Sequence, residues 1–143
     1  MAESFPKTSE DKLLNKYFEE KGGHLFLEVP IGSNRRNDIW PTGSKVRRFD
    51  GVNFPSNTCN IYNYKNYQDK FNSLITSNYE LEVIEVKKKL NRLVIGQVIA
   101  GYDMLKREYA DKSIYCRIIC SEGDPALEWV CKQRNIKVSI YES

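Results

Sequence analysis

The chain has 143 residues, of which 41% are hydrophobic and 29% are charged, and its formal net charge is +3. This length suits one domain that buries a core without disulfides or a structural metal, so we expect a single domain over residues 1–143. No apolar run approaches the roughly 18 residues that a membrane span requires, which excludes a transmembrane protein.

The N-terminal segment and the cysteines narrow the class of protein further. Residues 1–23 lack the basic stretch and apolar core of a signal peptide, so we expect a cytoplasmic location. No two of the four cysteines form a C-x-x-C pair, and His24 is the sole histidine. A zinc site or a Cys–His nucleophile is therefore poorly supported.

The first half of the chain predicts a helix, two strands and a less regular stretch. Apolar residues recur at helical spacing over 9–21. The segment "HLFLEVPIG" follows as a strand, and a second strand starts around "VRRFDGVNF" after a polar loop. Residues 55–79, rich in Asn and Tyr, predict an irregular loop and a short helix near 67–76.

The second half alternates strands and helices. "ELEVIEVKKK" begins apolar on both faces, which predicts a central strand. It is followed by a helix in "VIGQVIAGYDMLKREYA", a strand in "SIYCRIIC", a short helix after Asp124-Pro125 and a last strand in "IKVSIYE". The order α-β-β-β-α-β-α-β predicts an α/β domain with a mixed central β-sheet flanked by helices.

Two charged residues stand at the end of the central strand. Glu85 and Lys87 are two residues apart, so they project from one face about 7 Å from each other. Buried charges cost several kcal/mol unless a metal, a partner or solvent compensates them. The alternative is that the sheet ends there and both side chains are in water. Asp50, in "RRFDGV", adds a carboxylate on a strand that would lie beside this one.

Paired carboxylates and a lysine are suited to one kind of chemistry. Carboxylate oxygens are the ligands that Mg²⁺ and Mn²⁺ take together with phosphate and water. A lysine beside such a metal positions the attacking water or stabilises charge on the phosphate, as in metal-assisted hydrolysis.

These motifs resemble the PD-(D/E)xK nuclease superfamily, the restriction-endonuclease-like fold, over about residues 8–120. "RRFDGV" matches its aspartate position and "VIEVKKK" its Glu-x-Lys motif. The resemblance implies an αβββαβ core, here with a C-terminal αβ extension. It implies Asp50 and Glu85 as ligands of Mg²⁺ or Mn²⁺, and Lys87 as a catalytic residue. It also implies catalytic roles for Gln97 on the helix after the third strand and for Glu10 on the first helix.

Some assignments have competitors. Asp38, in "RRNDIW", competes with Asp50, but loop-forming residues surround it and Asp50 is favoured. Gln97 could lie only at the edge of the apolar face of its helix. Glu10 could serve only the helix dipole. Its rivals for the site are Glu19, Glu20 and Glu28.

The resulting hypothesis is a divalent-metal-dependent nuclease that acts on DNA rather than RNA. Basic residues in two segments near the site would hold the phosphate backbone: Arg35, Arg36, Arg47, Arg48, Lys88, Lys89 and Arg92. Tyr62, Tyr64 and Tyr67 would either stack on unpaired bases or, as is more common, cover a loop. The sequence does not decide whether the protein forms a homodimer that cuts both strands. The alternative function is a catalytically inactive nucleic-acid-binding or assembly module with the same fold.

Overall fold

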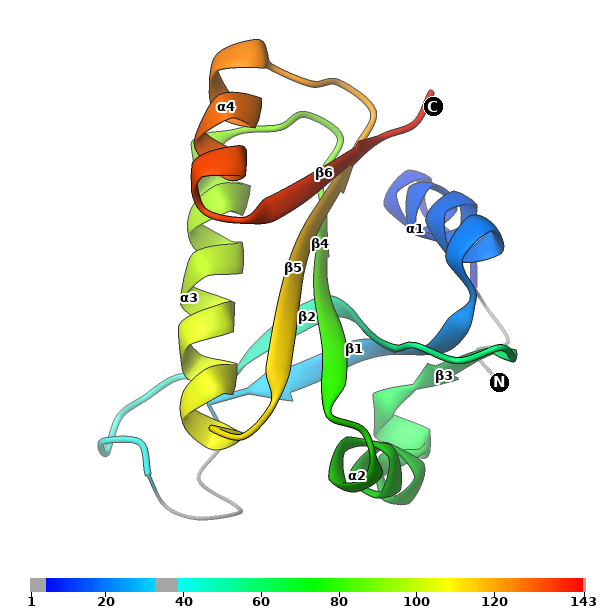
Figure 1. Ribbon diagram of the computed structural model, residues 1–143, viewed down its shortest axis with the longest axis vertical. Helices are drawn as coiled ribbons and strands as arrows, with labels where there is room; N and C mark the ends of the chain where they lie inside the picture. Colours follow the sequence, from blue (N-terminus) through cyan, green and yellow to red (C-terminus); the bar gives the residue numbers. More distant parts are fainter. Residues whose placement is uncertain (1–4, 33–38, 143) are drawn as a thin grey trace.

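A six-stranded mixed β-sheet flanked by helices forms the centre of the molecule (Figure 1). The structure is a computed structural model, and it describes residues 5–32 and 39–142. The helices in this part are α1 (Ser9–Lys21), α2 (Gln68–Ser77), α3 (Arg92–Glu108), α4 (Pro125–Gln133) and the short 3₁₀ helix η1 (Tyr64–Asn66). The strands are β1 (Gly23–Ile31), β2 (Arg47–Phe54), β3 (Cys59–Asn63), β4 (Glu80–Val86), β5 (Ser113–Cys120) and β6 (Ile136–Ile140). The predicted α/β class is confirmed.

The sheet has the strand order β3-β1-β2-β4-β5-β6. β2 pairs antiparallel with both β1 and β4, whereas β4, β5 and β6 run parallel to one another. Parallel neighbours need a crossover, and α3 and α4 supply the two crossovers of this half. β4 therefore lies inside the sheet, as its two apolar faces predict.

Helices α1 and α3 cover opposite faces of the sheet (Figure 1). The buried side of α1 packs on a cluster that includes Leu25, Leu27 and Ile84, whereas α3 contributes to the larger cluster on the other side. Gly101 of α3 allows the closest contact, because a Cβ there would lie 2.4 Å from Cε1 of Phe49. The helix thereby holds the Phe49 ring, one residue before Asp50.

The excursion between β2 and β4 contains more structure than the sequence predicts. The expected short helix is present as α2, but β3 and η1 precede it, and β3 pairs parallel with β1 at the edge of the sheet. The missed strand, "CNIYN", contains two asparagines, which are depleted in strands. The ring of Tyr62 stacks on Phe26 at 4.7 Å and contacts Tyr67 at 5.1 Å, so it covers the core.

None of the helices in the described part of the chain is long and apolar enough to cross a membrane. The four cysteines are free thiols, of which Cys116, Cys120 and Cys131 are buried and Cys59 is exposed.

Candidate active site

Asp50 and Glu85 lie next to each other where strands β2 and β4 meet. The antiparallel pairing ends with Gly51 opposite Ile84, so one further step along both strands places Asp50 opposite Glu85. The backbone N–H of Val86 donates to Oδ2 of Asp50 at 2.7 Å. The aspartate side chain thus takes the place that a carbonyl oxygen of the neighbouring strand would occupy in a regular ladder.

Burial and mutual repulsion keep a proton on this pair. Burial raises the pKa of Glu85 to about 9, and the neighbouring charge of Asp50 contributes to the rise. A hydrogen bond from neutral Glu85 to Asp50 acts in the same direction. Burial also raises the pKa of Asp50, while the Val86 N–H and Lys87 oppose that rise. At neutral pH Glu85 therefore keeps its proton, which limits the negative charge of the pair.

Lys87 and Glu10 lie close to the pair. Lys87 directly follows β4, where its backbone N–H donates to the carbonyl of Ile119 at 2.9 Å. Its ammonium lowers the pKa of Asp50 and of Glu10. Burial, followed by the charge of Asp50, raises the pKa of Glu10, which stands in the first turn of α1.

Glu28 on β1 is a further carboxylate at the same place. It lies opposite Asp50, between the pairs Leu27–Gly51 and Val29–Phe49. Its φ of 56° is in the left-handed region, which costs a non-glycine residue about 1–2 kcal/mol. Burial and Asp50 raise the pKa of Glu28, and the charge of Glu28 contributes to the raised pKa of Glu85.

Together these residues form what we call the carboxylate cluster, Glu10, Glu28, Asp50 and Glu85, with Lys87 beside it. The sequence identified Glu28 only as a rival of Glu10, because strand alternation gave no sign of its backbone conformation. Strained non-glycine residues are concentrated at functional sites.

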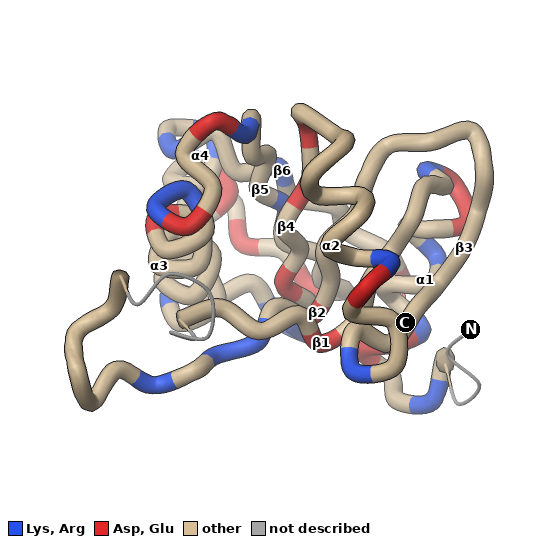
Figure 2. The backbone as a smooth tube through the Cα atoms, turned by 90° about the horizontal axis from the view of Figure 1, so that it is seen from below, with Lys and Arg blue, Asp and Glu red and all other residues tan. Residues whose placement is uncertain are grey.

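The other predicted site residues that the structure describes are exposed to solvent. Gln97 is exposed on α3, whose buried side carries Val94, Val98 and Leu105. Five of the predicted backbone-binding residues are exposed, namely Arg47, Arg48, Lys88, Lys89 and Arg92. Arg35, Arg36 and the competing aspartate Asp38 lie outside the described residues. Figure 2 shows basic segments in the loop that leads to β2 and acidic segments on the central strands.

The loop after β4 is fixed to the neighbouring loop by backbone bonds. The carbonyl of Lys88 accepts from the N–H groups of Ser121 and Glu122, at 3.0 and 2.9 Å. Lys89 forms an exposed ion pair with Glu122 at 3.8 Å. The backbone of this basic loop is thus held beside the cluster while the Lys88 side chain stays in solvent.

Within residues 5–32 and 39–142 there is no group of three or more His, Cys, Asp or Glu side chains arranged to hold a metal ion. Asp50 and Glu85 form a pair of oxygen donors. Mg²⁺ commonly binds one or two carboxylates and completes its shell with water and substrate phosphate. A carboxylate pair whose pKa values are raised by burial, and in Glu85 also by the neighbouring carboxylate, fits such an ion.

A buried polar network positions α1 over the sheet, and the sequence did not reveal it. The hydroxyl of Tyr17 donates to Glu82, and Nε of Arg117 donates to the other carboxylate oxygen at 3.1 Å. The Arg117 guanidinium also lies over the Tyr17 ring, 4.9 Å from its centre. Because Tyr17 and Glu10 share one helix, this network fixes the approach of Glu10 to the cluster.

Comparisons with known proteins provide one structural match. No family model and no curated protein matches the sequence. The fold is similar to the crystal structure of a repair endonuclease from Pyrococcus abyssi, with a TM-score of 0.53 and 15% sequence identity. The match covers 95% of this chain and 48% of that chain, so this chain spans about half the length of the matched protein. At this identity the likeness concerns the fold, which resembles that of an endonuclease.

Proposed function

We propose that this chain is a divalent-metal-dependent nuclease of the PD-(D/E)xK type that hydrolyses phosphodiester bonds in DNA. The observation that supports this most directly is the placement of Asp50 and Glu85 side by side on β2 and β4. The likeness of the fold to a repair endonuclease supports the same reaction class.

The carboxylate pair and the lysine have separate roles in the proposed reaction. A Mg²⁺ or Mn²⁺ ion held by Asp50 and Glu85 would polarise the phosphate and lower the pKa of a bound water. The ammonium of Lys87 stabilises the negative charge that develops on the phosphate oxygens. Because the pair must release its proton to bind a cation, cleavage should rise with pH through the neutral range.

Two basic segments flank the cluster and would hold the substrate. Arg47 and Arg48 open β2, three and two residues before Asp50. Lys88, Lys89 and Arg92 follow β4. Exposed cations of this kind bind phosphates without reading bases, so the proposed enzyme contacts mainly the backbone.

The proposal is tested by incubating the purified protein with end-labelled single-stranded, double-stranded and branched DNA and with RNA, with and without Mg²⁺ or Mn²⁺. We expect metal-dependent cleavage of DNA that Glu85→Gln abolishes. Glu80→Gln is the matched control, because Glu80 is exposed at the other end of the same strand. It should leave cleavage unchanged.

Two results would contradict the proposal. Equal cleavage by the wild type and Glu85→Gln would show that the activity lies outside this site. Binding of DNA without cleavage in any metal would instead support the alternative, an inactive nucleic-acid-binding or assembly module.

A further inference from the structure

A hollow of about 990 Å³ lies beside the carboxylate cluster. Strands β1 and β2 contribute Glu28 and Arg48 to its lining, and the facing segment, η1 and α2, contributes Tyr64, Lys65 and Asn72. The C-terminal end of α3 closes it. The hollow shares Glu28 with the cluster, and Glu28 stands opposite Asp50 on the neighbouring strand. Through Glu28 the hollow therefore borders the proposed site.

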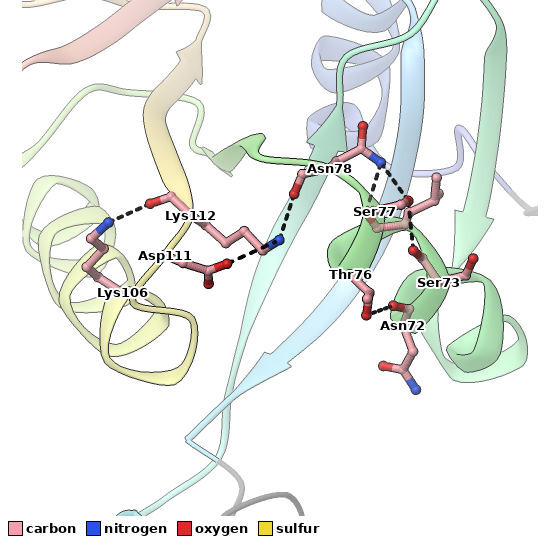
Figure 3. A network of polar contacts seen from close by, with 9 residues as sticks. Asn72, Ser73, Thr76, Ser77, Asn78, Lys106, Asp111 and Lys112 are labelled. Atoms are coloured by element: carbon pink, nitrogen blue, oxygen red, sulfur yellow. Dashed lines mark hydrogen bonds and ion pairs between the residues drawn. The ribbon is translucent and has the colours of Figure 1, made fainter.

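The lining combines an apolar base with side-chain amides. Phe71 and Ile75 are buried at the base, and the ring of Tyr64 packs edge-on against Phe71 at 5.2 Å. Asn72 is exposed on the α2 side, and its backbone carbonyl accepts from the hydroxyl of Thr76 at 2.7 Å, whereas its side-chain amide forms no hydrogen bond with the other described residues. Figure 3 shows the Asn72 amide directed away from the hydrogen bonds of α2.

Two cations, Arg48 and Lys65, and two carboxylates, Glu28 and Glu108, line the hollow. The carboxylate of Glu108 is already engaged, since it accepts from the N–H of Gly32 at 3.0 Å and from Nε1 of Trp40 at 2.8 Å. Arg48 and Lys65 form no salt bridge with other described residues. Arg48 and Lys65 are therefore the cations available to a ligand, and the charge of Arg48 also lowers the pKa of Glu28.

The helices around the hollow are tied together, so it is built into the fold. Nδ2 of Asn78 donates to the carbonyl of Leu74 at the end of α2, at 2.8 Å. Nζ of Lys112, a buried side chain, donates to the carbonyl of Asn78 at 2.9 Å. Lys106 of α3 donates to the carbonyl of Lys112 at 2.5 Å (Figure 3). This chain of bonds links α2 to α3 and fixes their separation.

We propose that the hollow binds an unpaired DNA strand next to the bond that is cut, an inference that rests on the proposed nuclease function. Amide side chains hydrogen-bond the Watson–Crick edges of bases, and those edges are free only when the strand is unpaired. Tyrosine rings stack on exposed bases. A duplex is held mainly by many cations along its phosphates, whereas two face this hollow.

The size of the hollow agrees with this ligand. Its volume of about 990 Å³ is at the upper end of the range of about 300–1,000 Å³ found for small-molecule sites. It suits a short stretch of extruded nucleotides. The substrate would then be DNA with an unpaired segment beside the cleaved bond.

The test is fluorescence anisotropy with a labelled single strand of DNA, an RNA of the same sequence and a blunt DNA duplex, with Ca²⁺ in place of Mg²⁺. The wild type should bind the DNA single strand most tightly. Asn72→Ala should weaken that binding about fivefold, as expected for one lost hydrogen bond. Lys65→Ala should reduce the slope of log K against log salt by about 0.7, which corresponds to one phosphate contact.

Neither variant should change duplex binding. Lys132→Ala, which removes an exposed lysine of α4 outside the hollow, should match the wild type with every ligand.

A second measurement, crosslinking, needs no variant. Ultraviolet crosslinking of the wild type to a single strand that carries 4-thiothymidine should label peptides from residues 63–76.

Four results would overturn the inference: equal affinity for single strand and duplex, tighter binding of RNA, wild-type binding by both hollow variants, or crosslinks elsewhere in the chain. The two proposals fail separately. Metal-dependent cleavage by a protein whose hollow variants bind normally refutes the hollow alone. Binding through the hollow without cleavage in Mg²⁺ or Mn²⁺ refutes the nuclease alone.

Discussion

Glu85→Gln should make the protein less sensitive to alkaline conditions. In the folded protein burial and Asp50 raise the pKa of Glu85 from its ordinary value of 4.5 to about 9. Between these values the folded state keeps a proton that the unfolded chain has released. Stability is therefore fully present below pH 4.5 and declines as the pH rises towards 9. Glutamine keeps the shape of the neutral acid and cannot ionise.

The size of the effect follows from the shift. Each pH unit within the window removes up to about 1.4 kcal/mol, so the wild type should lose at most about 4 kcal/mol of unfolding free energy between pH 5 and pH 8. For a chain of this size the melting temperature would fall by on the order of 10 °C. Glu85 is 8% exposed, so solvent screens the charge little.

Thermal melts in EDTA from pH 5 to pH 8 measure this directly. Glu85→Gln should match the wild type at pH 5 and melt at a higher temperature at pH 8, whereas the exposed control Glu80→Gln should follow the wild type throughout. Mg²⁺ should stabilise the wild type more at pH 8 than at pH 5 through mass action. If the melting temperatures of the wild type and of Glu85→Gln fell equally as the pH rose, the assignment of a buried, protonated pair would be refuted.

Three further predictions concern the neighbours of Glu85. Asp50→Ala removes the acceptor of the Val86 N–H and should cost about 1–3 kcal/mol in urea unfolding, whereas Asp50→Asn keeps an oxygen there and should cost less. Equal losses would contradict the role of that bond. Lys87→Ala should leave the melting temperature nearly unchanged and slow cleavage at least a hundredfold, and retained metal-dependent cutting would refute its catalytic role. Gly101→Ala should cost about 1–3 kcal/mol because its Cβ would meet Phe49, and it should impair cleavage by displacing β2 beside Asp50. The matched control, Gly96→Ala, has open space and should be neutral or stabilising by up to about 1 kcal/mol; equal melting temperatures of the two variants would contradict the packing.

The sequence predicted the elements with strong periodicity. The central strand and the helix after it appear as β4 and α3, since a run of apolar residues on both faces leaves few alternatives. The adjacency of Asp50 and Glu85 was a hypothesis from their positions on two predicted strands, and the structure places them side by side. β3 was missed because its stability comes from pairing with β1, which local propensity does not record.

Other features of the site depend on tertiary structure alone. The left-handed conformation of Glu28 and the network of Tyr17, Glu82 and Arg117 involve residues brought together by folding. A lone Glu, Tyr or Arg in an amphipathic segment carries no sign of such a partner. The placement of Gln97 in solvent likewise follows from the rotation of α3 on the sheet, which periodicity fixes only approximately.

The short pairing between β2 and β4 has a consequence for folding and motion. Strands β4, β5 and β6 with their helices form one continuous stretch of chain, and their contacts are comparatively local. Within the sheet, the N-terminal strands join this stretch through three residue pairs and the bond from Val86 to Asp50. We expect the carboxylate cluster to assemble late in folding, when these two halves dock. The Val86 amide should then exchange its hydrogen faster than amides inside β4 and β5. Its exchange rate would measure how often the two halves separate transiently.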